Sequence, residues 1–116
     1  MKDINFDFKQ LQAFLAVIDT GSFTAAARKL NVTQSSISQQ VANLELGLNT
    51  ALVNRSQRPI QMTIAGQALY PLGKKIIDNG VHLQERINAI SDGHISNLKI
   101  GFVDSISKTV GLDILK

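Results

Sequence analysis

The sequence predicts a mainly α-helical chain, in which three short helices and a small hairpin are followed by one long helix. Three observations support this: apolar residues recur at helical spacing, polar residues stand where helices start, and a heptad-like apolar pattern follows residue 63. With 116 residues and 44% hydrophobic residues, the chain is long enough to form a core. The absence of cysteine excludes disulfides, cysteine zinc sites and thiol catalysis.

The first helix is expected over residues 8–20. Asp7 is a suitable N-cap, and Gln10 stands where a capping box places its partner. Gly21 then ends the helix. The apolar stripe of this helix is expected to consist of Phe8, Leu11, Phe14, Leu15 and Ile18.

Two further helices are expected over residues 23–30 and 34–48, joined by a tight turn. Ser22 and Thr33 are suitable N-caps, and Asn31 tolerates the left-handed backbone of a turn. We expect Val32 to be buried in this turn. The inward face of the second of these helices should hold Ile37, Val41, Leu44 and Leu48. Such a pair is typical of a helix-turn-helix, whose second helix enters the DNA major groove by its N-terminal residues.

The predicted reading face at the start of helix 34–48 is polar and uncharged. Together with the N-cap, its members are Thr33, Gln34, Ser35, Ser36, Ser38 and Gln39. Glutamine can form two hydrogen bonds with adenine, and serine can donate or accept at any base. A neutral, solvated helix surface has the same composition, so the face alone does not decide between the two interpretations.

Positive charge surrounds this face. The cations between residues 20 and 62 are Arg28, Lys29, Arg55 and Arg58. Glu45 is the single anion there, so the segment carries the whole net charge of +3. Cations that flank a neutral helix fit a division between phosphate contacts and base contacts, and we predict DNA contacts for all four. Ordinary surface solubility is the alternative, and Glu45 is predicted to be structural.

A hairpin or wing is expected next. The β-prone pieces 51–53 and 60–63 lie on either side of a polar stretch that ends in Pro59. Thr63 is then expected to cap a helix over residues 64–91.

The helix over 64–91 is predicted to dimerise. Its apolar residues follow a pattern close to heptads, and the seam consists of Leu69, Leu72, Ile76, Leu83, Ile87 and Ile90. Pro71 and the glycines weaken the isolated helix, so it needs packing to persist. Too little chain remains to cover the seam, so we expect a second copy of the chain as its partner.

The segment from Phe14 to Glu45 resembles the N-terminal signature of LysR-type transcriptional regulators. The matching motifs include Gly21–Ala27 and the pair Thr33–Gln34, and the resemblance extends over residues 6–103. It implies a winged helix-turn-helix at 1–63, a linker helix that dimerises at 64–91, and a hinge and the start of an incomplete α/β effector-binding domain at 92–116. The first strand of that domain is expected at 98–103.

We therefore expect sequence-specific binding of double-stranded DNA by a homodimer, as the N-terminal part of a cytoplasmic bacterial regulator. The resemblance implies a tetramer for the full-length protein and a small-molecule effector only in the C-terminal domain. The sequence contains no recognisable enzyme motif, metal-ligand spacing, cofactor site or membrane segment. The alternatives are a winged-helix DNA binder of another family, such as a molybdate-dependent regulator, and a helical protein-interaction module without DNA binding.

Overall fold

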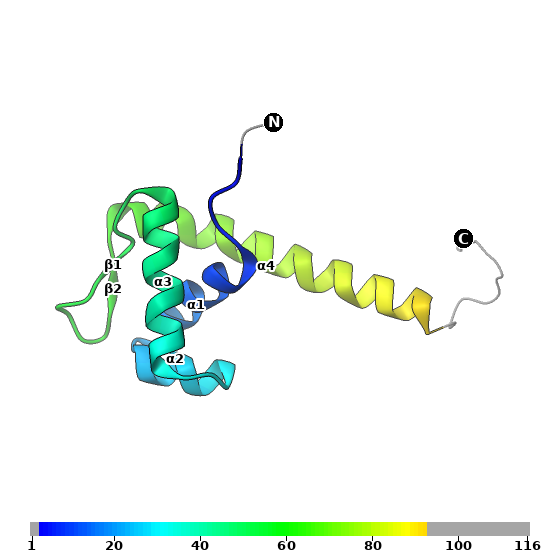
Figure 1. Ribbon diagram of the computed structural model, residues 1–116, viewed down its shortest axis with the longest axis horizontal. Helices are drawn as coiled ribbons and strands as arrows, with labels where there is room; N and C mark the ends of the chain where they lie inside the picture. The colour runs from blue at the N-terminus through cyan, green and yellow to red at the C-terminus, as the bar shows by residue number, and fades with distance from the viewer. Residues whose placement is uncertain (1–2, 93–116) are drawn as a thin grey trace. The chain divides into compact units, whose positions relative to one another are not determined.

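The computed structural model of the chain describes residues 3–92. Its elements are α1 (Phe8–Thr20), α2 (Phe23–Leu30), α3 (Gln34–Leu48), β1 (Val53–Asn54), β2 (Gln61–Met62) and α4 (Ile64–Ser91) (Figure 1). This confirms the mainly helical winged helix-turn-helix with a long following helix. The expected strand at 98–103 lies outside the described residues. Contacts divide the chain into two compact units between Asp78 and Asn79, within α4, and the three predicted domain ranges stay predictions.

The short helices begin and end where the sequence predicts because their caps form. Asp7 and Gln10 make the capping box, with N–H to side-chain oxygen distances of 2.9 and 3.1 Å. Ser22 and Thr33 each accept a hydrogen bond from the third N–H of the helix that they start. At the other ends, left-handed residues stop the helices, and these are Gly21, Asn31 and Asn49.

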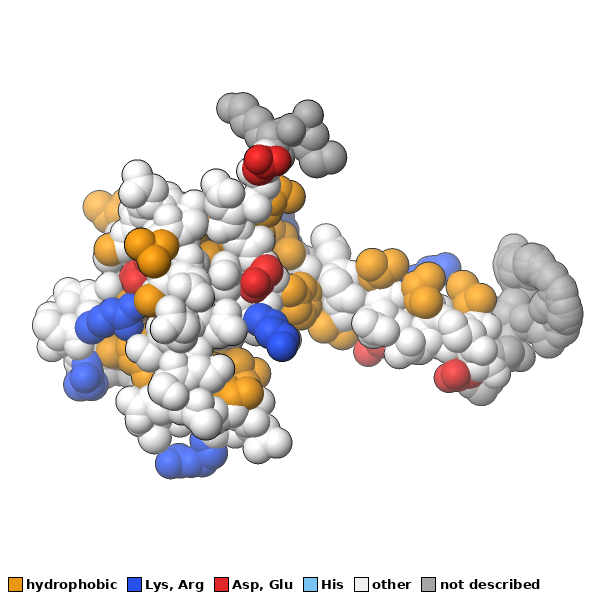
Figure 2. Space-filling view, in the orientation of Figure 1, with side chains coloured by type: hydrophobic (Ala, Val, Ile, Leu, Met, Phe, Trp, Pro, Cys, Tyr) orange, Lys and Arg blue, Asp and Glu red, His pale blue; other side chains and the backbone are white. Residues whose placement is uncertain are grey.

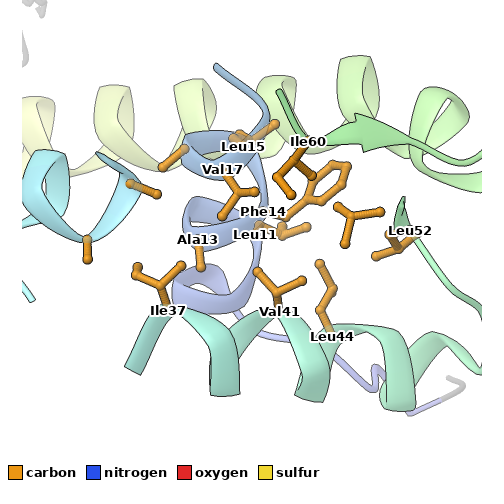
Figure 3. Close-up of a cluster of buried hydrophobic side chains, with 14 residues drawn as sticks. Leu11, Ala13, Phe14, Leu15, Val17, Ile37, Val41, Leu44, Leu52 and Ile60 are labelled. Atoms are coloured by element: carbon orange, nitrogen blue, oxygen red, sulfur yellow. The ribbon is translucent and has the colours of Figure 1, made fainter. Parts of the chain in front are cut away.

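The core forms where α1, α2 and α3 pack against one another and against the hairpin. Phe14 of α1 is fully buried at its centre (Figure 3). The other large side chains that are almost completely buried are Leu11, Val17, Ile37, Val41, Leu44 and Leu52. These residues come from α1, from α3 and from the start of the wing, so burial of this cluster fixes the wing relative to α3.

The wing is a two-stranded antiparallel hairpin in which Val53 pairs with Met62. The residue before β2 bonds to the residue that ends α1, because the Ile60 N–H donates to the Gly21 carbonyl oxygen at 2.9 Å. Gly21 has φ 83°, which side chains disfavour, and a Cβ there would lie 2.8 Å from the Pro59 Cβ. Only glycine therefore adopts this backbone conformation and leaves room for Pro59.

The first part of α4 packs on the same core. Thr63 caps the helix, as predicted, by accepting the Gly66 N–H at 3.1 Å. Gly66 is buried against the Leu52 carbonyl, where any Cβ would collide with the backbone. Half-buried apolar residues of α4 then continue this contact, and these are Ala65, Leu69, Tyr70 and Ile77.

Some local expectations are wrong. Val32 is 46% exposed, and backbone hydrogen bonds, among them Val32 N–H to the Ala27 oxygen at 3.0 Å, close the turn between α2 and α3 without burial of this side chain. Phe8 is also exposed, since it begins α1 at the margin of the core. Both wing strands are shorter than the β-prone pieces 51–53 and 60–63.

Candidate nucleic-acid interface

The start of α3 presents an uncharged polar surface. Of the residues predicted to read DNA there, Ser36 is half-buried, and the exposed ones are Thr33, Gln34, Ser35, Ser38 and Gln39. The core on the opposite face of the helix holds Ile37, Val41 and Leu44 in place. The polar residues are therefore displayed by a helix whose position is fixed by packing.

Side-chain hydrogen bonds organise this surface. Thr33 Oγ1 lies 3.2 Å from Ser35 Oγ, and Gln39 Nε2 donates to Asn43 Oδ1 at 2.9 Å. Gln34 Oε1 accepts a hydrogen bond from Thr24 Oγ1 of α2 at 3.2 Å. The free N–H groups at the start of α3 also lie here, and such groups favour a phosphate. The surface can therefore supply donors and acceptors to base edges without supplying charge.

The two cations at the end of α2 differ in their surroundings. Lys29 Nζ lies 4.0 Å from Asp19 Oδ2, which is a weak, solvent-exposed ion pair. Arg28 is exposed, and neither ion pair found within residues 3–92 involves it. Figure 2 displays lysine and arginine side chains over α2 and over the wing, the two elements next to α3.

Arg55 is engaged inside the chain. Its Nη2 donates to Glu45 Oε1 at 2.9 Å, and its guanidinium carbon lies 4.9 Å from the centre of the Phe23 ring. Glu45 Oε2 also accepts the N–H groups of Leu52 and Val53 at 2.8 and 3.3 Å. Glu45 thus joins α3 to the wing, in agreement with its predicted structural role. A DNA contact by Arg55 stays a prediction.

Arg58 lies at the exposed tip of the wing. Its Nη1 donates to the carbonyl oxygens of Arg55 and Gln57 at 2.6 and 2.9 Å. These bonds hold the guanidinium against the loop and leave Nη2 and Nε to donate elsewhere. An arginine in this arrangement can bind a phosphate through two parallel hydrogen bonds.

Sequence reasoning missed two contacts of this region. Thr24 was not among the predicted site residues, and no motif marks its contact with Gln34. The second contact joins Tyr70 of α4 to Asp19, whose carboxylate accepts the phenolic hydrogen. This hydrogen bond, with smaller contributions from burial and the negative charge of Asp19, raises the pKa of Tyr70.

The predicted dimerisation residues are largely uncovered. Leu69 is half-buried against the core of its own chain. The exposed members are Leu72, Ile76, Leu83, Ile87 and Ile90. The apolar seam available to a partner therefore starts at Leu72.

The described residues hold no cluster of three or more side chains suited to bind a metal. Within residues 3–92, no helix has the length and hydrophobicity needed to cross a membrane.

Comparison with known proteins agrees with this arrangement. HTH-type transcriptional activator AaeR of Escherichia coli (strain K12) is 37% identical over 102 residues, which are 88% of this chain and 33% of that protein. The chain thus spans about a third of the length of the curated relatives it matches.

Two solved complexes with DNA have similar folds. A BenM_DBD/catB site 1 DNA complex matches with a TM-score of 0.70 and 34% identity, over 77% of this chain and 96% of the matched chain. A CbnR_DBD–DNA complex matches with a TM-score of 0.67 and 35% identity, over 74% and 99%.

A family described as "Bacterial regulatory helix-turn-helix protein, lysR family" matches residues 8–67. The match runs from the first residue of α1 through the wing into the first turn of α4, and it includes the whole candidate interface. Because it covers more than half of the sequence, this chain belongs to the lysR family of bacterial regulatory helix-turn-helix proteins.

Proposed function

We propose that this chain binds double-stranded DNA sequence-specifically, as the N-terminal part of a LysR-type transcriptional regulator. One observation carries the proposal: the uncharged, exposed start of α3 lies between exposed cations on α2 and on the wing. The two DNA complexes formed by proteins of similar fold support it. The family match supports a LysR-type regulator over a molybdate-dependent one.

The proposed mechanism divides the work between neutral and charged residues. The start of α3 enters the major groove, where Gln34 and the neighbouring serines contact base edges. Arg28 binds a backbone phosphate, and Arg58 on the wing binds the flanking backbone or the minor groove. The phosphate contacts set the register on the duplex, and the α3 contacts select the sequence.

We further propose that two copies pair through the exposed seam of α4 and present two α3 helices to successive major grooves. Half-sites would then be separated by about 34 Å or a multiple of it. In the full-length protein, a cytoplasmic tetramer would bind its small-molecule effector through a C-terminal domain. The chain itself would act by binding, without enzymatic activity.

Selection of bound DNA from a random pool, followed by fluorescence anisotropy at two salt concentrations, tests this function. The selected duplex should bind more tightly than a scrambled duplex of the same composition. Affinity should fall with salt by a slope of about −0.9 in log–log form for each phosphate neutralised. A chain that enriches no sequence and binds neither duplex at low salt would instead be a protein-interaction module.

The paired state can be tested by light scattering. Leu83→Asp should convert a dimer to a monomer, because it places an unpaired charge in the apolar seam. His82→Asp is the matched control, since it adds the same charge to a neighbouring exposed position outside the predicted seam. A monomeric wild-type chain at tens of micromolar would contradict pairing through α4.

A further inference from the structure

Gln34, which we propose to read a base, is contacted by a side chain of the preceding helix. Thr24 is the second residue of α2, and its Oγ1 donates to Gln34 Oε1 at 3.2 Å. Gln34 is the first residue of α3, so the contact bridges the two helices of the helix-turn-helix at its exposed surface. Its place beside the candidate base contact suggests a role in DNA reading.

The hydrogen-bonding capacity of the two side chains is compatible with such a role. A glutamine amide has two donors on Nε2 and two acceptor sites on Oε1. After accepting from Thr24, Gln34 retains both donors and one acceptor site. A bidentate contact with adenine requires one donor and one acceptor. The contact with Thr24 therefore limits where the amide can lie and leaves it able to read adenine.

Both ends of the contact are attached to fixed backbone. The Ser22 cap fixes the first turn of α2 by accepting the Ala25 N–H at 2.9 Å, and the β-branched side chain of Thr24 has few rotamers. The Thr33 cap fixes the first turn of α3 in the same way, with a distance of 3.1 Å to the Ser36 nitrogen. Without Thr24, the torsions of the Gln34 side chain would have to be restricted at the moment of binding, and this opposes binding.

We infer that Thr24 is a positioning residue for Gln34. Its hydroxyl orients the amide before DNA binds, and it thereby strengthens the base preference at the base pair that Gln34 reads. This inference rests on the proposed function, because it requires Gln34 to contact a base.

The test measures base preference with the whole 116-residue chain. Base preference is the ratio of the dissociation constants of two duplexes that differ at a single base pair. The base pair to be tested is the one at which Gln34→Ala lowers this ratio. Thr24→Val removes the hydroxyl but keeps the side-chain shape, and it should lower this ratio roughly twofold to tenfold. Thr24→Ser keeps the hydroxyl and should retain the ratio. Thr24→Ala is a second variant without the hydroxyl at this exposed helical position, in case valine perturbs α2.

A double-mutant cycle separates positioning from a direct contact. Once Gln34→Ala is present, Thr24→Val should have no further effect on the ratio. If the two effects add, or if Thr24→Val weakens all duplexes equally, the inference is overturned while the proposed function stands. A wild-type chain without any sequence preference would overturn the proposed function itself.

Discussion

At its C-terminal end, α3 directs the Glu45 carboxylate to two backbone N–H groups of the wing and to Arg55. At its N-terminal end, α3 carries no charge, and exposed side chains such as Gln34 are linked only by hydrogen bonds between neutral groups. The charge at the first end is mostly shielded, since the Glu45 side chain is 17% exposed. One end of the helix therefore holds the domain together, while the other remains available to a partner.

The largest effect is expected at the anchored end. Glu45→Ala should lower the free energy of unfolding by about 3 kcal/mol, because it leaves two wing N–H groups and Arg55 without their acceptor. Urea denaturation measures this, and Glu85→Ala on an exposed part of α4 is the matched control. A loss no greater than that of the control would mean that Glu45 does not anchor the wing.

At the N-terminal end of α3, a substitution should change DNA reading strongly and the free energy of unfolding only slightly. Gln34→Ala should change the free energy of unfolding by less than about 0.5 kcal/mol, since the side chain is exposed. It should lower discrimination at one base pair by about 1–3 kcal/mol, because a bidentate contact is lost. Anisotropy with single-base variants of the selected duplex measures this, and Gln84→Ala on α4 is the control. Unchanged base preference would remove Gln34 from the reading role.

The wing holds, within four positions, one arginine that is bound inside the chain and one that is available to a partner. Arg55 donates to Glu45, whereas Arg58 at the tip keeps donors that can bind elsewhere. Arg58→Ala should reduce the salt slope by about 1 and weaken binding roughly fivefold at 0.15 M salt, for all sequences alike. Arg86→Ala, an exposed arginine on α4, should leave affinity and slope unchanged. Selective weakening at one sequence would indicate base reading by the wing instead.

The contrast between the ends of α3 also marks how far the sequence alone can predict the molecule. Caps such as Asp7 and Thr33 are local, so helix bounds could be placed from spacing and residue type. The helix-turn-helix pattern located the candidate face of α3, and the LysR resemblance then added to that prediction. The partner of Arg55 could not be predicted by spacing, because Glu45 is ten residues away and meets it only after the wing has folded back. The apolar character of Val32 does not predict burial, because backbone hydrogen bonds can close a tight turn while an apolar side chain in it stays exposed.

The smallest effect concerns Asp19, which lies at the end of α1 and, like Glu45, has its carboxylate engaged within the chain. It accepts from Tyr70 of α4 and lies near Lys29 of α2. Because the pKa of Tyr70 is raised in the folded state, the hydrogen bond from Tyr70 to Asp19 contributes fully to stability below the ordinary tyrosine pKa of 10.0. The contribution should then be lost as the pH rises from there through the folded-state pKa.

Tyr70→Phe should accordingly cost about 0.5 kcal/mol at neutral pH, a small value because the hydrogen bond is exposed to solvent. The difference between wild type and variant should shrink as the pH rises from 10.0 through the raised folded-state pKa of Tyr70, because the hydroxyl that donates to Asp19 is then deprotonated. Urea denaturation at neutral pH and in this alkaline range measures the difference. If it remained constant across the alkaline range, Asp19 would not hold α4 through the Tyr70 hydroxyl, and apolar packing alone would attach the first part of α4 to the core.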